Sequence, residues 1–146
     1  METRAYLRVV AALPLMLVGI VACSALFQDG HQRVVGFIDN GGLPIKALIV
    51  PDTVRARLSF TATVSTFGSS CFRPDGAEVK TNGLVVSVTP YDVAPPPGSM
   101  CTADFGAHPR SVKLTFAAPG TGLVRLRGRG LASSSLTLED SVAVRP

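Results

Sequence analysis

The 146-residue sequence predicts an all-β fold, because hydrophobic and polar residues alternate with a period of two along most of the chain after Ile45. Runs rich in Val, Thr and Phe are short, and Gly, Pro and Asn residues separate them at intervals typical of turns. No window has the 3.6-residue hydrophobic period of an amphipathic helix. The length fits one domain, so we expect a single β domain after an N-terminal segment of different character.

The composition narrows the class of protein further. The chain is 47% hydrophobic and 16% charged, it has no Trp, and its formal net charge is +4. These values argue against a disordered tail, a coiled coil or a collagen-like repeat. The small positive charge is not the strong basic footprint that nucleic-acid binding requires, so we expect no nucleic-acid partner.

Residues 1–22 have the pattern of a secretory signal peptide. Arg4 and Arg8 supply the positive N-terminal region, and the apolar run from Val9 to Val21 contains no charge. A helix needs roughly 20 residues to cross a hydrocarbon layer about 30 Å thick, which is longer than this run. We therefore expect a signal segment that is removed, and not a permanent transmembrane helix.

The end of the apolar run reads Ile20-Val21-Ala22-Cys23 and resembles the lipobox of bacterial lipoproteins. The resemblance implies that the Cys23 thiol receives a diacylglycerol, that the signal is cut before Cys23, and that the new amino group is acylated. Two or three acyl chains hold a protein stably on a membrane, whereas one chain gives marginal binding. The alternative is that Cys23 is only the small residue after an ordinary signal peptide.

The same resemblance implies a location in the bacterial cell envelope, with the membrane as partner through the lipid on Cys23. Ser24 stands where some inner-membrane lipoproteins carry a retaining aspartate, which favours the outer membrane in a diderm cell. Residues 23–32 are mainly polar and predict a lipidated tether, and residues 33–146 predict the folded domain. A first strand within residues 34–38 is compatible with this boundary.

Five runs of alternating residues predict the clearest strands. They are 58–65, 86–89, 111–116, 124–129 and 136–144. The last run keeps apolar residues at even positions except at Asp140, where we expect a β-bulge or a turn. Turn residues between the runs lie at Pro51-Asp52, Pro74-Asp75-Gly76, Asn82-Gly83, 95–98 and Pro119-Gly120.

Short strands at this spacing predict an immunoglobulin-like antiparallel β-sandwich of about seven strands. The sequence also resembles bacterial Ig-like domains, and more closely envelope lipoproteins with a Val-Pro-Asp-Thr-Val opening, here Val50 to Val54. The resemblance covers about residues 33–145. The chain has no Trp, and its two remaining cysteines are too close in sequence for the usual bridge between the sheets. The adhesive function of such domains is therefore not carried over.

With Cys23 assigned to lipid, Cys71 and Cys101 remain and predict one disulfide in an oxidising compartment. Both cysteines lie in turn-rich segments, so we expect the bridge to hold two loops at one end of the sandwich. Closing a loop of about 30 residues corresponds to roughly 3–4 kcal/mol of stabilisation in the chain-entropy model.

Two alternatives assign chemistry to the same region. Cys71, Cys101, Asp104 and His108 offer thiolate, carboxylate and imidazole ligands for a metal, although their spacing matches no compact ligand hairpin. A Ser-His-Asp arrangement would need His108 with Asp104 or Asp92, and no Gly-x-Ser-x-Gly motif accompanies them. We expect His108 to be an ordinary surface histidine, and we predict no catalytic residue, no metal and no cofactor.

Arg125, Arg127 and Arg129 share one face of a predicted strand, at intervals of about 7 Å. Guanidinium groups pair bidentately with phosphate and carboxylate, so this row is a candidate contact for an anionic partner. The alternative is that these outward charges keep an edge strand from pairing with another chain.

The sequence thus predicts a lipid-anchored, non-catalytic envelope module that acts through contacts with an unidentified protein or glycan. The alternative is a small envelope protein that binds a metal or another ligand at the loop end from Cys101 to His108. The state of the cysteines separates the two interpretations, because a disulfide favours the first and free thiolates favour the second.

Overall fold

The computed structural model of the protein describes residues 30–39 and 41–146. The predicted signal segment, Cys23 and the first part of the predicted tether lie outside the described residues. Predictions about them therefore stay predictions. No helix within the described ranges is long and apolar enough to cross a membrane.

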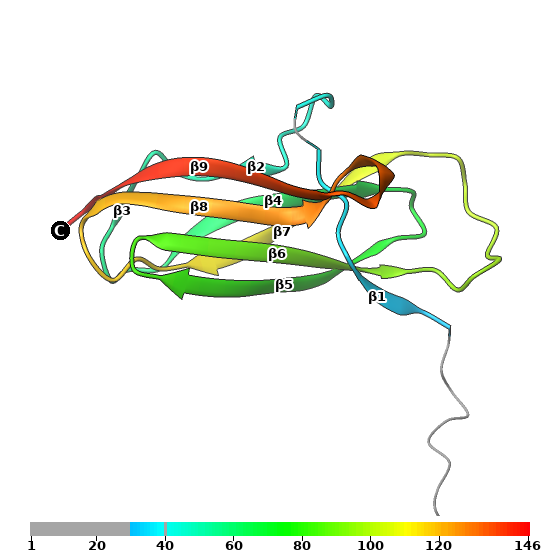
Figure 1. Ribbon diagram of the computed structural model, residues 1–146, viewed down its shortest axis with the longest axis horizontal. Helices are drawn as coiled ribbons and strands as arrows, with labels where there is room; N and C mark the ends of the chain where they lie inside the picture. Colours follow the sequence, from blue (N-terminus) through cyan, green and yellow to red (C-terminus); the bar gives the residue numbers. More distant parts are fainter. Residues whose placement is uncertain (1–29, 40) are drawn as a thin grey trace, which may run out of the picture.

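The predicted all-β sandwich is confirmed, and its strands form two sheets that pack face to face (Figure 1). A short 3-10 turn, η2 (Leu131–Ser133), separates the last two strands. The described residues form nine strands: β1 (Gln32–Val35), β2 (Leu48–Ile49), β3 (Thr53–Arg55), β4 (Phe60–Gly68), β5 (Arg73–Asn82), β6 (Val85–Ala94), β7 (Gly106–Leu114), β8 (Gly120–Arg129) and β9 (Ser135–Arg145).

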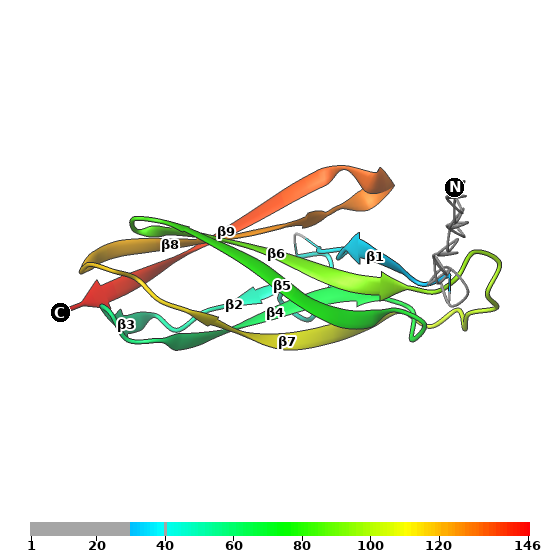
Figure 2. The same cartoon turned by 90° about the horizontal axis from the view of Figure 1, so that it is seen from below.

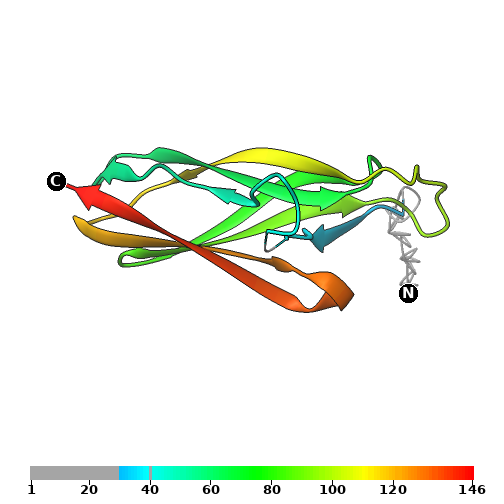
Figure 3. The same ribbon diagram turned by 90° about the horizontal axis from the view of Figure 1, so that it is seen from above.

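The larger sheet has the order β1-β6-β8-β9-β3, with β5 paired to β6, and the smaller sheet has the order β2-β4-β7. Views along the layers show the two sheets twisting over each other (Figures 2 and 3). The predicted antiparallel pairing holds for five strand pairs, but β6 with β8 and β3 with β9 run parallel. The first parallel pair arises because the chain crosses to the other sheet as β7 between β6 and β8, and so returns in its original direction.

The core lies between the sheets and follows the predicted alternation. Val86 and Val88 of β6 and Val124 and Leu126 of β8 are completely buried, and Val64 of β4 faces them from the smaller sheet. Their polar neighbours point outward, as the period of two requires. Burial of this apolar surface drives the two sheets together.

Leu58 is an exception to the predicted alternation, since it is 57% exposed. Its strand begins only at Phe60, because Arg57 has a φ of +64° and the chain turns there. The Leu58 amide donates to the Arg55 carbonyl at 3.4 Å, which closes this turn. The expected strand at 58–65 therefore starts two residues later, and it extends to Gly68.

The prediction of a β-bulge or a turn at Asp140 is wrong. The pairing of β8 with β9 runs without a break from Gly120 opposite Val144 to Arg129 opposite Ser135. Asp140 lines an open cavity of about 350 Å³ beside Lys46, so its inward position is solvated and a carboxylate fits there without breaking the strand.

The irregularity of the larger sheet lies instead in β5. A turn was expected at 74–76, but these residues belong to the strand, and its register against β6 shifts between Pro74 and Ala77. Gly76 has a φ of +79°, which glycine adopts without steric cost. The turn signal in the sequence therefore marks a β-bulge.

Candidate functional site

A shallow hollow of about 240 Å³ lies on the outer face of the larger sheet, over strands β5, β6 and β8. Its cationic lining consists of Lys80, Arg125 and Arg127, and we call it the basic hollow. Strand register explains the grouping, because Lys80 pairs with Ser87 and Ser87 pairs with Arg125. The pairing thus aligns an ammonium, a hydroxyl and a guanidinium in one row across the sheet.

Two of these cations already have acidic neighbours. Arg125 Nε lies 2.6 Å from Glu139 Oε1, and Lys80 Nζ lies 2.9 Å from Glu78 Oε1. The hydrogen bond and the charge of Lys80 hold the pKa of Glu78 below its usual value. Arg127 forms no ion pair with any residue that the structure describes, so its guanidinium is the cation available to an external anion.

The structure divides the predicted arginine row. Arg125 and Arg127 line the basic hollow, whereas Arg129 does not. Arg129 instead joins the sheet to the first segment of the domain: its amide donates to the Gly36 carbonyl at 2.9 Å, and its carbonyl accepts from the Ile38 amide at 2.8 Å. The proposed protection of an edge strand is wrong for this row, because β8 lies between β6 and β9.

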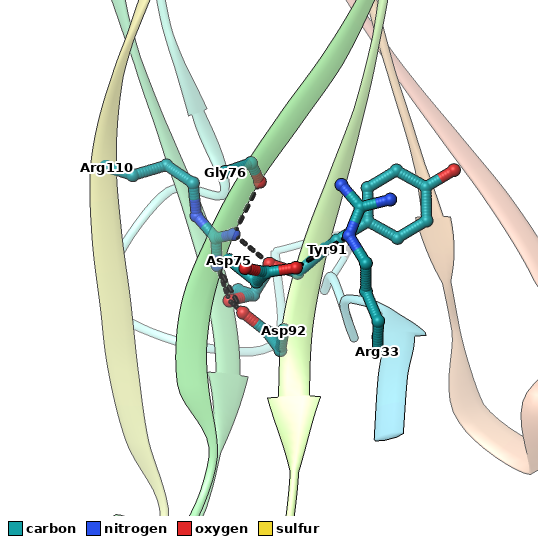
Figure 4. A network of polar contacts seen from close by, with 7 residues as sticks. Arg33, Asp75, Gly76, Tyr91, Asp92 and Arg110 are labelled. Carbon is teal, nitrogen blue, oxygen red and sulfur yellow. Dashed lines mark hydrogen bonds and ion pairs between the residues drawn. The ribbon is translucent and has the colours of Figure 1, made fainter. Parts of the chain in front are cut away.

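A buried polar network occupies the core near one end of the sandwich (Figure 4). The Arg110 guanidinium of β7 pairs with Asp92 of β6, and these side chains are only 7% and 3% exposed. Arg110 also donates to the Tyr91 carbonyl and, at 2.9 Å, to the Gly76 carbonyl at the bulge of β5. Thr66 of β4 accepts from Arg110 and donates to Asp92 Oδ1 at 2.9 Å. The network thus connects the two sheets through charged and neutral hydrogen bonds.

A second, exposed group of contacts ties β1 to the same region. Arg33 stacks over the Tyr91 ring at 3.7 Å, and its Nε lies 2.6 Å from Asp75 Oδ2 (Figure 4). The Tyr91 hydroxyl donates to Glu78 Oε2 at 3.3 Å. These contacts fix β1, the strand that follows the predicted tether, against β5 and β6.

The predicted disulfide is present: Cys71 is bonded to Cys101, with their Cα atoms 5.9 Å apart. It joins the β4–β5 turn to the β6–β7 loop, so it holds two loops at one end, as expected. Asp104 lies beside it and accepts hydrogen bonds from the Thr102 hydroxyl and from the Ser70 amide at 3.2 Å. The bond from Thr102, supported by those from Ser70, lowers the pKa of the Asp104 carboxyl.

His108 differs from the expected surface histidine. It is half-buried, it lies opposite Thr66 in the β4–β7 pair, and its Nε2 is buried without a hydrogen-bond partner among the described residues. The two carboxylates considered as its partners are engaged elsewhere, Asp92 by Arg110 and Asp104 by Ser70. Among the residues that the structure describes, the geometry therefore assembles no Ser-His-Asp site around His108.

The metal alternative required four ligands at the loop end. Two of them, Cys71 and Cys101, are consumed by the disulfide. Within residues 30–39 and 41–146, no group of three or more His, Cys, Asp or Glu residues is placed to hold a metal ion. The loop end thus does not bring the proposed ligands together.

Comparisons with protein-family models, with curated proteins and with solved structures returned no match. A candidate function must therefore be inferred from the charged and polar residues of this protein itself.

The buried Arg110–Asp92 pair was missed by sequence reasoning, although a signal for it exists. Asp92 continues the inward row of Val86 and Val88, and Arg110 continues the inward row of Val112. An acidic and a basic residue at core positions of two strands indicate a buried ion pair, since neither charge is stable there alone.

Proposed function

We propose that this protein is a lipid-anchored, non-catalytic module of the bacterial cell envelope that holds an anionic group of a protein or glycan partner in the basic hollow. The observation that carries this proposal is the convergence of Lys80, Arg125 and Arg127 on one solvent-exposed face. Three paired strands support the hollow, so the cations are presented by a rigid surface and not by a mobile loop.

Arg127 is the central residue of the proposed contact. It has no acidic partner among the described residues, whereas Glu139 and Glu78 already neutralise part of the charge on Arg125 and Lys80. An incoming carboxylate or phosphate would gain a bidentate guanidinium contact without displacing an existing ion pair. The neighbouring hydroxyl of Ser87 adds a donor within the same hollow.

Two features support anchoring in the envelope. The segment Ile20-Val21-Ala22-Cys23 resembles a lipobox, and the disulfide between Cys71 and Cys101 is typical of exported proteins. Gln32 pairs with Ala94, directly before the loop that contains Cys101, so the tether enters the domain at the disulfide end. Eight residues lie between Cys23 and Gln32, and the chain from one to the other spans at most about 30 Å, which would hold this end close to the bilayer.

A binding experiment with a carboxylated polysaccharide tests the basic hollow. We expect the protein to bind it in low salt, and we expect Arg127→Ala to weaken binding about tenfold, the effect of losing one charge-assisted contact. Arg145→Ala is the matched control, because it removes the same charge from an exposed position outside the hollow. Neutral dextran should not bind. Equal losses in the two arginine variants would contradict a specific site and indicate only general charge attraction.

A further inference from the structure

Strand β5 forms one edge of the larger sheet, and along this edge it has no strand partner in the described part of the chain. The Gly76 carbonyl near the bulge accepts from Arg110, which leaves the segment from Ala77 to Asn82 open. An open, regular strand edge is a template for pairing with another chain. The question is which strand this edge fits.

The backbone groups that face outward can be assigned from neighbouring hydrogen bonds. The Pro90 carbonyl accepts from the Gly36 amide at 2.9 Å, so Pro90 points its backbone groups away from β5. Ala77, which pairs with Pro90, therefore points its own amide and carbonyl toward solvent. Because these directions alternate along a strand, Val79 and Thr81 also present free donors and acceptors at this edge.

The side chains around Val79 are self-complementary. Glu78 precedes Val79 and Lys80 follows it, and both carry their charges on the outer face. If two copies pair antiparallel across a twofold axis at Val79, Glu78 of each copy lies opposite Lys80 of the other. Val79, which is 39% exposed and pairs with the buried Val88, then packs against its symmetry mate.

Other registers lack this match. A twofold axis at Glu78 would place two carboxylates opposite each other, and an axis at Lys80 would do the same with two ammonium groups. Like charges directly opposite each other destabilise strand pairs. A shift by one residue would turn the side chains of one copy to the wrong face.

We propose that the β5 edge binds a second copy of this chain, forming a twofold-symmetric dimer in which residues 77–81 of both copies pair antiparallel. The two larger sheets then become one continuous sheet, with each Glu78 paired across the interface to Lys80. Both basic hollows lie on the same face of this joined sheet. The dimer does not depend on what the hollows bind.

Sedimentation equilibrium of the full chain in density-matched detergent tests the dimer. We expect the wild-type chain to dimerise, and we expect Glu78→Lys and Lys80→Glu each to raise the dissociation constant about tenfold or more, because each creates two like-charge pairs. An equimolar mixture of the two variants should recover the wild-type affinity as a heterodimer. Recovery in the mixture cannot come from repair of the fold, since it restores only contacts between chains.

Two further variants complete the test. Val79→Pro removes an outward amide and leaves the ladder to β6 intact, so it should abolish dimerisation in a folded chain. Glu139→Lys makes the same charge change away from the edge and should leave the dissociation constant unchanged. The proposal would be overturned by a wild-type chain that stays monomeric up to about 1 mM. It would also be overturned by a dimer whose dissociation constant does not change with Val79→Pro or with either charge reversal.

Discussion

At the residue scale, the Arg110–Asp92 pair is the most demanding interaction in the core. Both side chains are almost completely buried, and hydrogen bonds from Thr66 and to the carbonyls of Tyr91 and Gly76 compensate part of their loss of water, while Arg110 Nε is buried without a hydrogen-bond partner among the described residues. Such a pair is weak evidence for high stability, but loss of one partner leaves an uncompensated buried charge. The pair therefore makes this end of the sandwich sensitive to single substitutions.

We expect Asp92→Ala to lower the free energy of unfolding by about 3–5 kcal/mol, because Arg110 would remain buried without its counter-charge. Glu139→Ala is the control, since it removes one partner of the exposed pair with Arg125 and should cost no more than about 1 kcal/mol. Urea denaturation measures both values. Similar small losses in the two variants would contradict a buried ion pair between Arg110 and Asp92.

Gly36 provides a second prediction at this scale. A Cβ atom there would lie 2.2 Å from Thr66 Cγ2 and 2.9 Å from Asp92 Oδ2, so Gly36→Ala would displace members of the buried network. We expect a loss of about 1–3 kcal/mol. Gly106→Ala is the matched control, because no described residue other than its chain neighbours has an atom within 4 Å of its Cβ position. If both alanine variants unfold at the same urea concentration, the close approach at Gly36 does not exist.

At the scale of elements, the disulfide connects two loops that the sheets alone leave separate. Cys71 lies between β4 and β5, and Cys101 lies between β6 and β7, at a sequence separation of 30. We expect the double variant Cys71→Ser/Cys101→Ser to lose about 3–4 kcal/mol, since its unfolded chain regains the entropy of the open loop.

Guanidinium denaturation measures this loss. The wild-type protein treated with reductant should match the double variant, and the double variant itself should not respond to reductant. A wild-type protein whose stability does not change on reduction would contradict the bridge.

The strands show how far sequence patterns determine the fold. Alternation identified the segments around Val86, Val112 and Val124, because each needs one buried face. Alternation does not say which strand is the neighbour, so the parallel pairing of β6 with β8 was not predicted. A turn and a bulge share the same glycine preference, which explains why Gly76 was placed in a turn.

The candidate site could likewise be predicted from the sequence only in part. The period of two predicts that Arg125 and Arg127 point outward, but it does not predict that Lys80 lies next to them. Lys80 is 45 residues away from Arg125 in sequence and reaches the basic hollow only because β6 separates β5 from β8. The sequence therefore identifies two of the cations as outward-facing residues, but it does not predict that Lys80 joins them in the hollow or that Arg129 lies outside it.

At the scale of the whole molecule, the two ends of the sandwich differ. The chain enters through β1 at the end that carries the disulfide, and the C-terminus lies at the opposite end (Figure 1). An anchor at Cys23 would thus place the disulfide loops toward the membrane and the C-terminus away from it. The basic hollow lies on the outer face of the sheet between these ends, where a partner in the envelope could reach it.

We expect the mature protein to begin at a lipidated Cys23 and to contain one disulfide, between Cys71 and Cys101. Intact-mass spectrometry of the protein purified from bacterial membranes tests both parts at once. We expect the mass of residues 23–146 plus a diacylglyceryl group on Cys23, with or without a third acyl chain on its amino group, and minus two hydrogen atoms for the disulfide; Cys23→Ser should lack the lipid mass. A wild-type mass equal to the unprocessed chain, or to a processed chain without lipid, would contradict the claim.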